Sequence, residues 1–224
     1  MNTEGAEILY QLVVDKVREV SQPDPTQTLL FDVCCGTGTI GITCLKAGVV
    51  GQVIGVDISE PAINDANRNA ILNGYTTNQV NADVSQENTI CNNPNTRFVA
   101  SRAELVLGRE IQDAKQRQRD SDVDDGTTRK EMKFIAVVDP AREGLHADVV
   151  KAIRSNQRIT RLVYVSCNPT ATLVRDAALF CSPPTKRYTG RPFRITSAQP
   201  VDMFPLTNHC EMVMVFDRLK EEDM

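Results

Sequence analysis

The stretch TLLFDVCCGTGTIG, residues 28–41, carries the pattern that decides the fold. Residues 28–33 are mostly apolar and rich in large side chains, which is typical of a strand inside a parallel sheet. A glycine-rich turn follows, and an apolar run continues from it to about Gly48 with the length of a helix. A strand that enters a helix through such a turn is the opening unit of many open α/β sheets. We therefore expect this unit to begin an α/β fold.

The rest of the chain repeats the alternation of strand and helix. Patterns typical of strands recur at residues 53–56, 97–100, 134–138, 162–165, 193–201 and 210–216. Patterns typical of helices occupy residues 3–20, 59–73, 145–154 and 169–180, with a further helix through residues 105 and 107. This alternation predicts a doubly wound, mostly parallel sheet with helices on both faces. No helix separates the last two strands, so we expect them to form an antiparallel C-terminal edge.

The composition bounds the class of protein. The chain has 224 residues, a net charge of −4 and a sequence pI of about 5.3, which suits one domain without a strong basic stripe. Any RNA contact should therefore need help from a region outside this domain. Seven cysteines without C-x-x-C spacing argue against a disulfide framework or a zinc site. Neither a membrane span nor a signal peptide is apparent, so we expect an intracellular monomer, in cytosol or nucleus.

Polar stretches and the chain ends define the expected domain boundaries. Residues 82–95 resemble a loop insertion, and the charged run 109–133 resembles a frayed helix end followed by a mobile loop. We expect one domain over residues 1–220 and a loose tail over 221–224. Because the first helix begins almost at residue 1, we also expect the chain to be part of a longer protein.

The glycine-rich turn indicates which ligand the domain holds. Gly36-x-Gly38-x-x-Gly41 matches the dinucleotide fingerprint, which on its own is not specific. Asp32, four residues before Gly36, would repel a pyrophosphate but suits a ligand with an amino group and a sulfonium. The pattern therefore favours S-adenosylmethionine. Asp57 ends the second strand, where an acid can bind ribose hydroxyls, although a solvated turn residue is the alternative.

A lone cysteine ends the strand in LVYVSCNP, residues 162–169. Cys167 would lie where open α/β sheets bind ligands, beyond the carboxyl end of a strand. Asn168 is expected to cap a helix whose first residue is Pro169. The N-terminus of that helix would favour the thiolate over the thiol. A buried structural cysteine is the alternative, since cysteine is among the most buried residue types.

Several reactive side chains fall at strand ends. Asp32, Asp57, Asp139 and Cys167 each follow or end an expected strand, and such ends converge on one crevice in a doubly wound sheet. Glu211 opens an apolar strand, where a carboxylate is costly unless it has a partner or a task. An edge-strand acid facing water is the alternative for Glu211, and a turn-capping acid before proline is the alternative for Asp139.

These motifs together resemble those of the RNA (uracil-5-)-methyltransferases. The resemblance spans nearly the whole chain and rests on Asp32 with the glycine turn, Asp139-Pro140-Ala141-Arg142, Ser166-Cys167-Asn168-Pro169 and His209-Cys210-Glu211. It implies a Rossmann-like, class I S-adenosylmethionine-dependent methyltransferase fold, with residues 1–220 as the catalytic domain. It also implies tRNA as the substrate, without a metal ion or a membrane. The family's RNA-binding N-terminal portion is absent from this chain, so tRNA binding is expected to require it.

The same resemblance assigns roles to individual residues. It implies that Cys167 is the nucleophile and Glu211 the base. The residues that match the family's cofactor contacts are Cys34, Thr39, Asp57, Asp139 and Arg102, to which the glycine turn adds Gly36 and Gly38 and the carboxylate argument adds Asp32. Two departures from the family pattern are Ala141 in place of a second proline and Cys34 in place of a usual phenylalanine.

The chemistry fits one cysteine and one carboxylate independently of the family. Carbon 5 of uracil is a poor nucleophile. A thiolate that adds to carbon 6 turns the ring into an enolate, and carbon 5 of this enolate can attack a sulfonium methyl. A base must then remove the carbon 5 proton. One alternative is an amino-group methyltransferase that uses Asp139-Pro140, although Arg142 stands where that type needs an aromatic residue. Another is a cofactor-binding RNA module without turnover, acting in tRNA folding or as a scaffold.

Overall fold

A computed structural model describes residues 2–76, 95–109, 112–113 and 132–223. The loop insertion expected at 82–95 and most of the loop expected at 109–133 lie outside these residues. At the borders of the second loop, residues 103–109 are helical and Lys133 already belongs to a strand. The helical residue 109 agrees with the expected helix end, and the following strand begins at Lys133, one residue earlier than expected.

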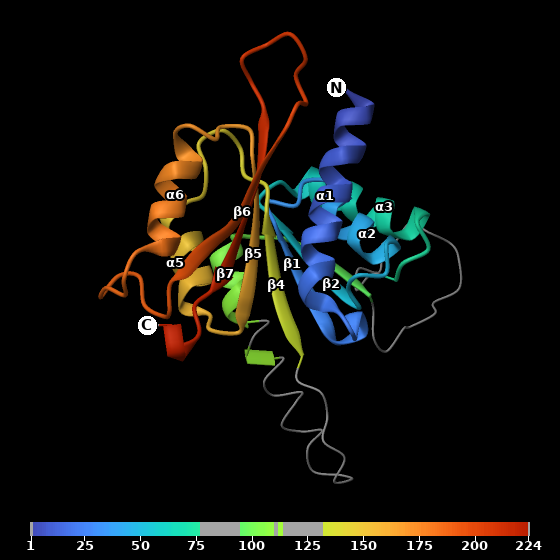
Figure 1. Ribbon diagram of the computed structural model, residues 1–224. Coiled ribbons are helices and arrows are strands. Elements are labelled where there is room, and N and C mark those ends of the chain that lie inside the picture. Colours follow the sequence, from blue (N-terminus) through green and yellow to red (C-terminus); the bar gives the residue numbers. More distant parts are fainter. Residues whose placement is uncertain (1, 77–94, 110–111, 114–131, 224) are drawn as a thin grey trace, which may run out of the picture.

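The described residues form one seven-stranded sheet in the order β3-β2-β1-β4-β5-β7-β6 (Figure 1). Its strands are β1 (Thr28–Val33), β2 (Gln52–Asp57), β3 (Thr96–Ala100), β4 (Lys133–Val138), β5 (Ile159–Ser166), β6 (Phe193–Val201) and β7 (Glu211–Arg218). The first five strands are parallel, and β7 runs antiparallel to both β5 and β6. This confirms the predicted mostly parallel sheet with an antiparallel edge. The order adds that β7 lies inside the sheet, because β6 forms the edge.

Helices cover both faces of the sheet, as Figure 1 shows. The helices α1 (Thr3–Ser21), α2 (Thr39–Lys46) and α3 (Glu60–Leu72) pack on one face, which we call the α1 face. The helices α5 (Ala147–Ser155) and α6 (Thr172–Cys181) and the helical residues 103–109 pack on the other, the α5 face. Short 3-10 turns form at η1 (Pro25–Gln27) and at η2 (Glu221–Asp223), within the tail expected to be loose.

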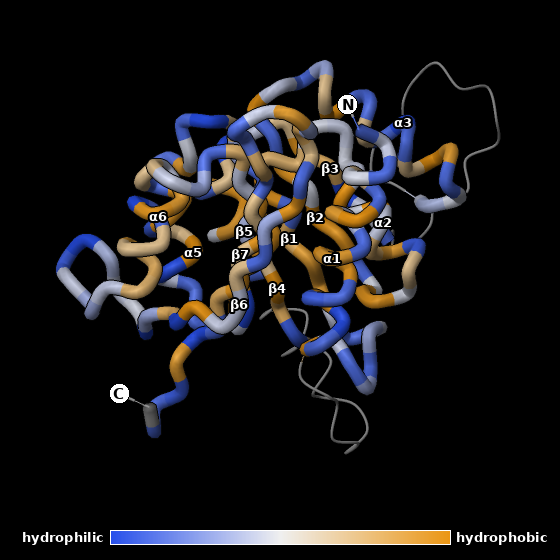
Figure 2. The backbone as a smooth tube through the Cα atoms, turned by 45° about the horizontal axis from the view of Figure 1, so that its top comes forward, coloured by the Kyte–Doolittle hydropathy of each residue, from blue (hydrophilic) through white to orange (hydrophobic). Residues whose placement is uncertain are grey.

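Two apolar layers hold these helices to the sheet. Figure 2 shows the hydrophobic segments concentrated in the strands and on the helix faces beside them. On α1, Val13 and Val17 are almost completely buried, and burial of each such side chain contributes about 1.5–3 kcal/mol. Arg161 of β5 adds a polar clamp, because its guanidinium donates to Asp217 of β7 and to Glu19 of α1. Helix α1 is thereby fixed across β5 and β7.

The chain after β5 differs from the sequence prediction. A helix capped by Asn168 and starting at Pro169 is wrong, because α6 begins at Thr172 with Ala171 as its N-cap residue. The Asn168 side-chain amide instead donates to the Arg142 carbonyl (3.2 Å), and the Asn168 N–H donates to Ser166 Oγ (3.1 Å). The first of these bonds joins the segment after β5 to the loop after β4, and both compete with helix formation.

Candidate active site

Strands β5 and β7 bring Cys167 and Glu211 together. Their antiparallel register pairs Ser166 with Met212, and one further residue along the same register places Cys167 opposite Glu211. Residues directly opposite each other in an antiparallel pair point to the same face of the sheet. The charge of Glu211 also acts on the Cys167 thiol. The expected nucleophile and the expected base are therefore neighbours.

The surroundings of Cys167 favour the thiol. Its side chain is half-buried, and burial raises the pKa of the thiol, with the negative charge of Glu211 adding to the effect. Arg142 opposes this shift and lowers the pKa. The expectation that a helix N-terminus favours the thiolate is therefore wrong, since α6 begins only at Thr172. Any reaction through Cys167 must first remove a proton from sulfur.

Glu211 is buried, although a glutamate side chain with an ordinary pKa is charged at neutral pH. It is 9% exposed, and its Oε2 atom has no hydrogen-bond partner among the described residues. Burial raises the pKa of Glu211, and Arg142 lowers it. The alternative of an edge-strand acid facing water does not hold, because β7 lies between β5 and β6. A buried acceptor without a partner costs about 1–3 kcal/mol, which marks Glu211 as a group with a task.

Asp32 lies beneath the glycine-rich turn. The residue is fully buried, its Oδ2 accepts from the Gly41 N–H (2.9 Å), and its Oδ1 has no partner in the described structure. Burial raises its pKa to about 7 against the lowering effect of the Gly41 bond, and the charges of Asp139 and Asp57 add to the rise. Because the carboxyl is enclosed here, its contact with a ligand's amino group or sulfonium stays a prediction.

Asp57 holds the glycine-rich turn against the end of β2. Its two carboxylate oxygens accept from the Gly36 N–H (3.0 Å) and from the Ser59 N–H (2.9 Å). Each oxygen keeps a second lone pair that a ribose hydroxyl can use. Gly38 begins α2 at φ 77°, and a Cβ there would lie 2.8 Å from the Phe98 ring. The turn therefore requires glycine at this position for both conformation and space.

A cavity of about 400 Å³ opens at the carboxyl ends of β1 to β4 on the α5 side. It contains three residues predicted from the sequence, Cys34, Asp57 and Arg102. The remaining lining residues are Val56, Ile58, Ser101, Ala103, Glu104, Pro140, Ala141, Gly144, Leu145, His146 and Val149. Apolar walls with an acid among them suit the adenosine part of a nucleotide-like ligand.

The other predicted ligand contacts are not among the residues that line this cavity. Gly36, Gly38 and Thr39 form the turn into α2, where Thr39 is exposed, and Thr39 Oγ1 lies 3.2 Å from Thr37 Oγ1. Asp139 follows β4 and retains solvent contact. Burial within the strand-end cluster and the charge of Glu211 nevertheless raise its pKa to about 7. The structure thus brings Asp139 near both the reactive pair and the cavity.

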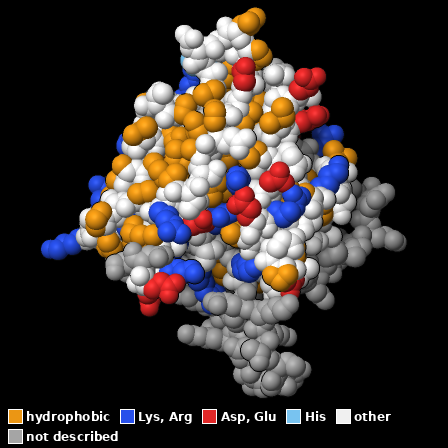
Figure 3. Space-filling model, viewed as in Figure 1, with side chains coloured by type: hydrophobic (Ala, Val, Ile, Leu, Met, Phe, Trp, Pro, Cys, Tyr) orange, Lys and Arg blue, Asp and Glu red, His pale blue; other side chains and the backbone are white. Residues whose placement is uncertain are grey.

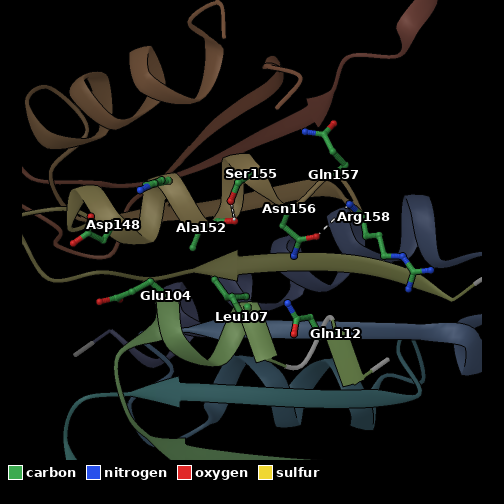
Figure 4. Close-up of a pocket in the computed structure, with 11 residues that line it drawn as sticks. Glu104, Leu107, Gln112, Asp148, Ala152, Ser155, Asn156, Gln157 and Arg158 are labelled. Carbon is green, nitrogen blue, oxygen red and sulfur yellow. Dashed lines mark hydrogen bonds between the residues drawn. The ribbon is translucent and has the colours of Figure 1, made fainter. Parts of the chain in front are cut away.

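A larger cavity of about 520 Å³ lies elsewhere, between the helical residues 103–109 and α5 (Figure 4). Its labelled residues include Leu107, Ala152 and Arg158. None of the residues predicted to act in catalysis or cofactor binding is among those that line it. The strand-end cavity, and not the larger one, therefore belongs to the candidate site.

Tyr10 on α1 lies near the acids at the strand ends, which the sequence analysis did not predict. Its ring is half-buried against the core of the α1 face. Burial raises the pKa of its hydroxyl, and the charges of Asp139, Asp32 and Glu211 raise it further. A tyrosine beside the apolar stripe of the first helix was the available signal, but it does not reveal which strand ends the helix covers.

The chain is similar in sequence to known proteins. A family model described as "Methyltransferase domain" matches residues 30–117. Over these residues the chain resembles a methyltransferase domain. The chain is 37% identical over 220 residues to tRNA (uracil-5-)-methyltransferase homolog B from Mus musculus, and the aligned residues make up 97% of this chain and 37% of the mouse protein. The chain is 36% identical over 221 residues to homolog A from the same organism, and the aligned residues make up 99% of this chain and 29% of that homologue.

The chain thus spans about a third of the length of these relatives. Solved structures agree on the fold. An rRNA methylase from Streptococcus thermophilus has a TM-score of 0.55 at 12% identity and covers 98% of this chain and 99% of its own. The TrmK protein of M. capricolum, in complex with S-adenosyl-homocysteine, has a TM-score of 0.51 at 9% identity and covers 92% and 68%. The fold is that of the class I S-adenosylmethionine-dependent methyltransferases.

Among the residues that the structure describes, no cluster of three or more His, Cys, Asp or Glu side chains could hold a metal ion. In the same described part of the chain, no helix is long and apolar enough to cross a membrane.

Proposed function

We propose that this methyltransferase domain methylates carbon 5 of uridine in tRNA, with S-adenosylmethionine as the methyl donor. The observation that carries the proposal is the apposition of Cys167 and Glu211 across β5 and β7, next to a cavity at the strand ends. The names of the relatives, which are tRNA (uracil-5-)-methyltransferases, support the same reaction.

The two side chains would act in sequence. Cys167 loses its proton and its sulfur adds to carbon 6 of uracil, which moves the ring's electrons toward carbon 5 and carbonyl oxygen 4. After carbon 5 has gained a methyl group, Glu211 removes the remaining proton from that carbon. The ring electrons then return and expel the Cys167 thiolate. The raised pKa of Glu211 makes its carboxylate a stronger base than an exposed one.

The residues around the cavity fit S-adenosylmethionine, which supplies an electrophilic methyl group when bound. The apolar walls, with Val56 and Leu145 among them, would hold the adenine, and the free lone pairs of Asp57 would accept from the ribose hydroxyls. The glycine turn would pass close to the ligand because Gly36 and Gly38 have positive φ angles. The partnerless Oδ1 of Asp32 marks where a positively charged ligand would be favoured.

Arg142 and Asp139 would orient the uracil. The Arg142 backbone is held by two donors, Asn168 Nδ2 (3.2 Å) and Thr172 Oγ1 (3.1 Å), so its side chain starts from a fixed position. That side chain is exposed, and its positive charge acts on both Cys167 and Glu211. A cation there would stabilise the negative charge that develops on the ring after addition.

The decisive experiment is covalent trapping with tRNA in which uridine is replaced by 5-fluorouridine. Fluorine at carbon 5 cannot be removed as a proton, so an adduct formed by Cys167 persists on a denaturing gel. We expect the adduct with the wild-type chain and with Cys181→Ala, whose half-buried sulfur lies at the end of α6, but not with Cys167→Ala. No adduct with the wild type at tRNA concentrations that saturate binding, or turnover that methylates an amino group, would overturn the proposal.

A further inference from the structure

The loop that joins β6 to β7, residues 202–210, stands beside the reactive pair. It projects past the carboxyl ends of the parallel strands, at the top of the view in Figure 1. Its last residue, Cys210, directly precedes Glu211, so the loop ends where the proposed base begins. An RNA that delivers a uridine to Cys167 and Glu211 would therefore come close to this loop.

The loop has a defined conformation. At its base, Met203 is 7% exposed and packs where α1 begins, because a Cβ on Gly5 would lie 3.1 Å from its Sδ atom. Within the loop, the Phe204 N–H donates to Asp202 Oδ1 (3.2 Å), and both the N–H and the hydroxyl of Thr207 donate to the Phe204 carbonyl. The His209 N–H donates to Thr207 Oγ1 (3.2 Å). Little ordering would remain to be done when a ligand binds.

Beyond Asp202, residues 203–209 of the loop present rings rather than charges. Phe204 is 36% exposed, and its ring meets the His209 ring edge to face, with centroids 6.5 Å apart at 84°. Residues 203–209 include no Lys, Arg, Asp or Glu. Figure 3 shows hydrophobic side chains at this tip. A surface without cations is a poor site for phosphates but a suitable one for the flat face of a base.

We propose that Phe204 and His209 form a stacking platform for the nucleobase that flanks the target uridine. The proposal rests on the proposed function and names how the same site recognises RNA. A uridine that enters the crevice must leave its stack, which uncovers the faces of its neighbours. The rings replace that lost stacking at the mouth of the crevice, while the buried and partnerless Oε2 of Glu211 marks the depth that the uridine reaches.

The test measures kcat and KM for unmodified tRNA transcript with three variants of the full chain. Stacking of a base on an aromatic side chain contributes enough that Phe204→Ala should raise KM by about 5- to 100-fold. Phe204→Trp should restore the wild-type value because it keeps an aromatic face. Leu206→Ala removes a fully exposed apolar side chain from the same loop and should leave KM unchanged. Calorimetry with S-adenosylhomocysteine should give equal affinities for all of them.

Each outcome decides the matter. If the wild type methylates uridine while Phe204→Ala stays within twofold in KM, the platform is wrong and the proposed function stands. If Leu206→Ala raises KM as much as Phe204→Ala does, the loop is a general apolar contact, as for a protein partner, and stacking is refuted. If the wild type neither methylates tRNA nor forms the 5-fluorouridine adduct, the proposed function fails and the platform fails with it.

Discussion

The substitution Asp32→Asn should raise the free energy of unfolding, and its effect on cofactor binding can be measured separately. Asp32 is fully buried with one hydrogen bond, and burial raises its pKa from 3.8 to about 7. Folding therefore disfavours its ionised form by about three pKa units, which corresponds to roughly 4 kcal/mol at a pH above 7. Asparagine keeps an oxygen that can accept from Gly41 and carries no charge. The variant should unfold less readily at pH 8 than the wild type, by up to about 4 kcal/mol.

The sign of the pH dependence follows from proton binding. Between pH 4 and pH 7 the folded wild type holds a proton on Asp32 that the unfolded chain has released. Wild-type stability should therefore fall relative to the variant as the pH rises through this range, by about 1.4 kcal/mol per pH unit at most. Below pH 4 both states are protonated, and the difference between the two proteins should nearly vanish.

Urea unfolding at several pH values measures both quantities. The control is Asp65→Asn, which removes the same charge from an exposed position on α3 and should change stability by less than about 0.5 kcal/mol. Titration with S-adenosylmethionine should show weaker binding to Asp32→Asn if the carboxylate serves the cofactor's positive charges. A difference in stability that is constant with pH, or a variant that is less stable at pH 8, would refute the reasoning.

Three further predictions concern the reactive pair. Cys167→Ala should abolish methylation but keep S-adenosylhomocysteine binding, as calorimetry beside a methyl-transfer assay can show; appreciable turnover would exclude Cys167 as the nucleophile. Glu211→Gln should slow turnover by about 10²–10⁴-fold and accumulate a protein–RNA adduct on denaturing gels, since the base acts after methyl transfer; slow turnover with no adduct would point to an earlier role. Because burial raises the pKa of Cys167, adduct formation with 5-fluorouridine RNA should accelerate from pH 7 to pH 9; a flat profile would contradict this.

Much of the fold could be predicted because each strand and helix leaves a local pattern. The convergence of Asp57 and Asp139 at one edge also follows from the sequence, since parallel strands share the direction of their carboxyl ends. The position of β7 between β5 and β6 could not be predicted, because a pair of adjacent strands does not reveal which of them meets the parallel sheet. The apposition of Cys167 with Glu211 depends on that choice.

The predictions that failed did so for one reason, because contacts between residues far apart in the sequence determined the local structure. Asn-Pro after a strand favours a helix cap locally, but the Arg142 carbonyl offers the Asn168 amide another partner. Tyr10 received no role because only the packing of α1 across β5 and β7 brings it near the acids at the strand ends. In both cases contacts between distant parts of the chain, and not the local sequence, determined the outcome.

The position of β7 has a consequence for biosynthesis. A chain emerging from the ribosome can assemble the five parallel strands, the cavity and Cys167 before Glu211 has been made. Until β7 arrives, β5 presents an unpaired edge with a continuous apolar run from Leu162 to Val165, the kind of edge that recruits strands from other chains. The insertion of a single late strand thus closes a site of aggregation and supplies the base in one event.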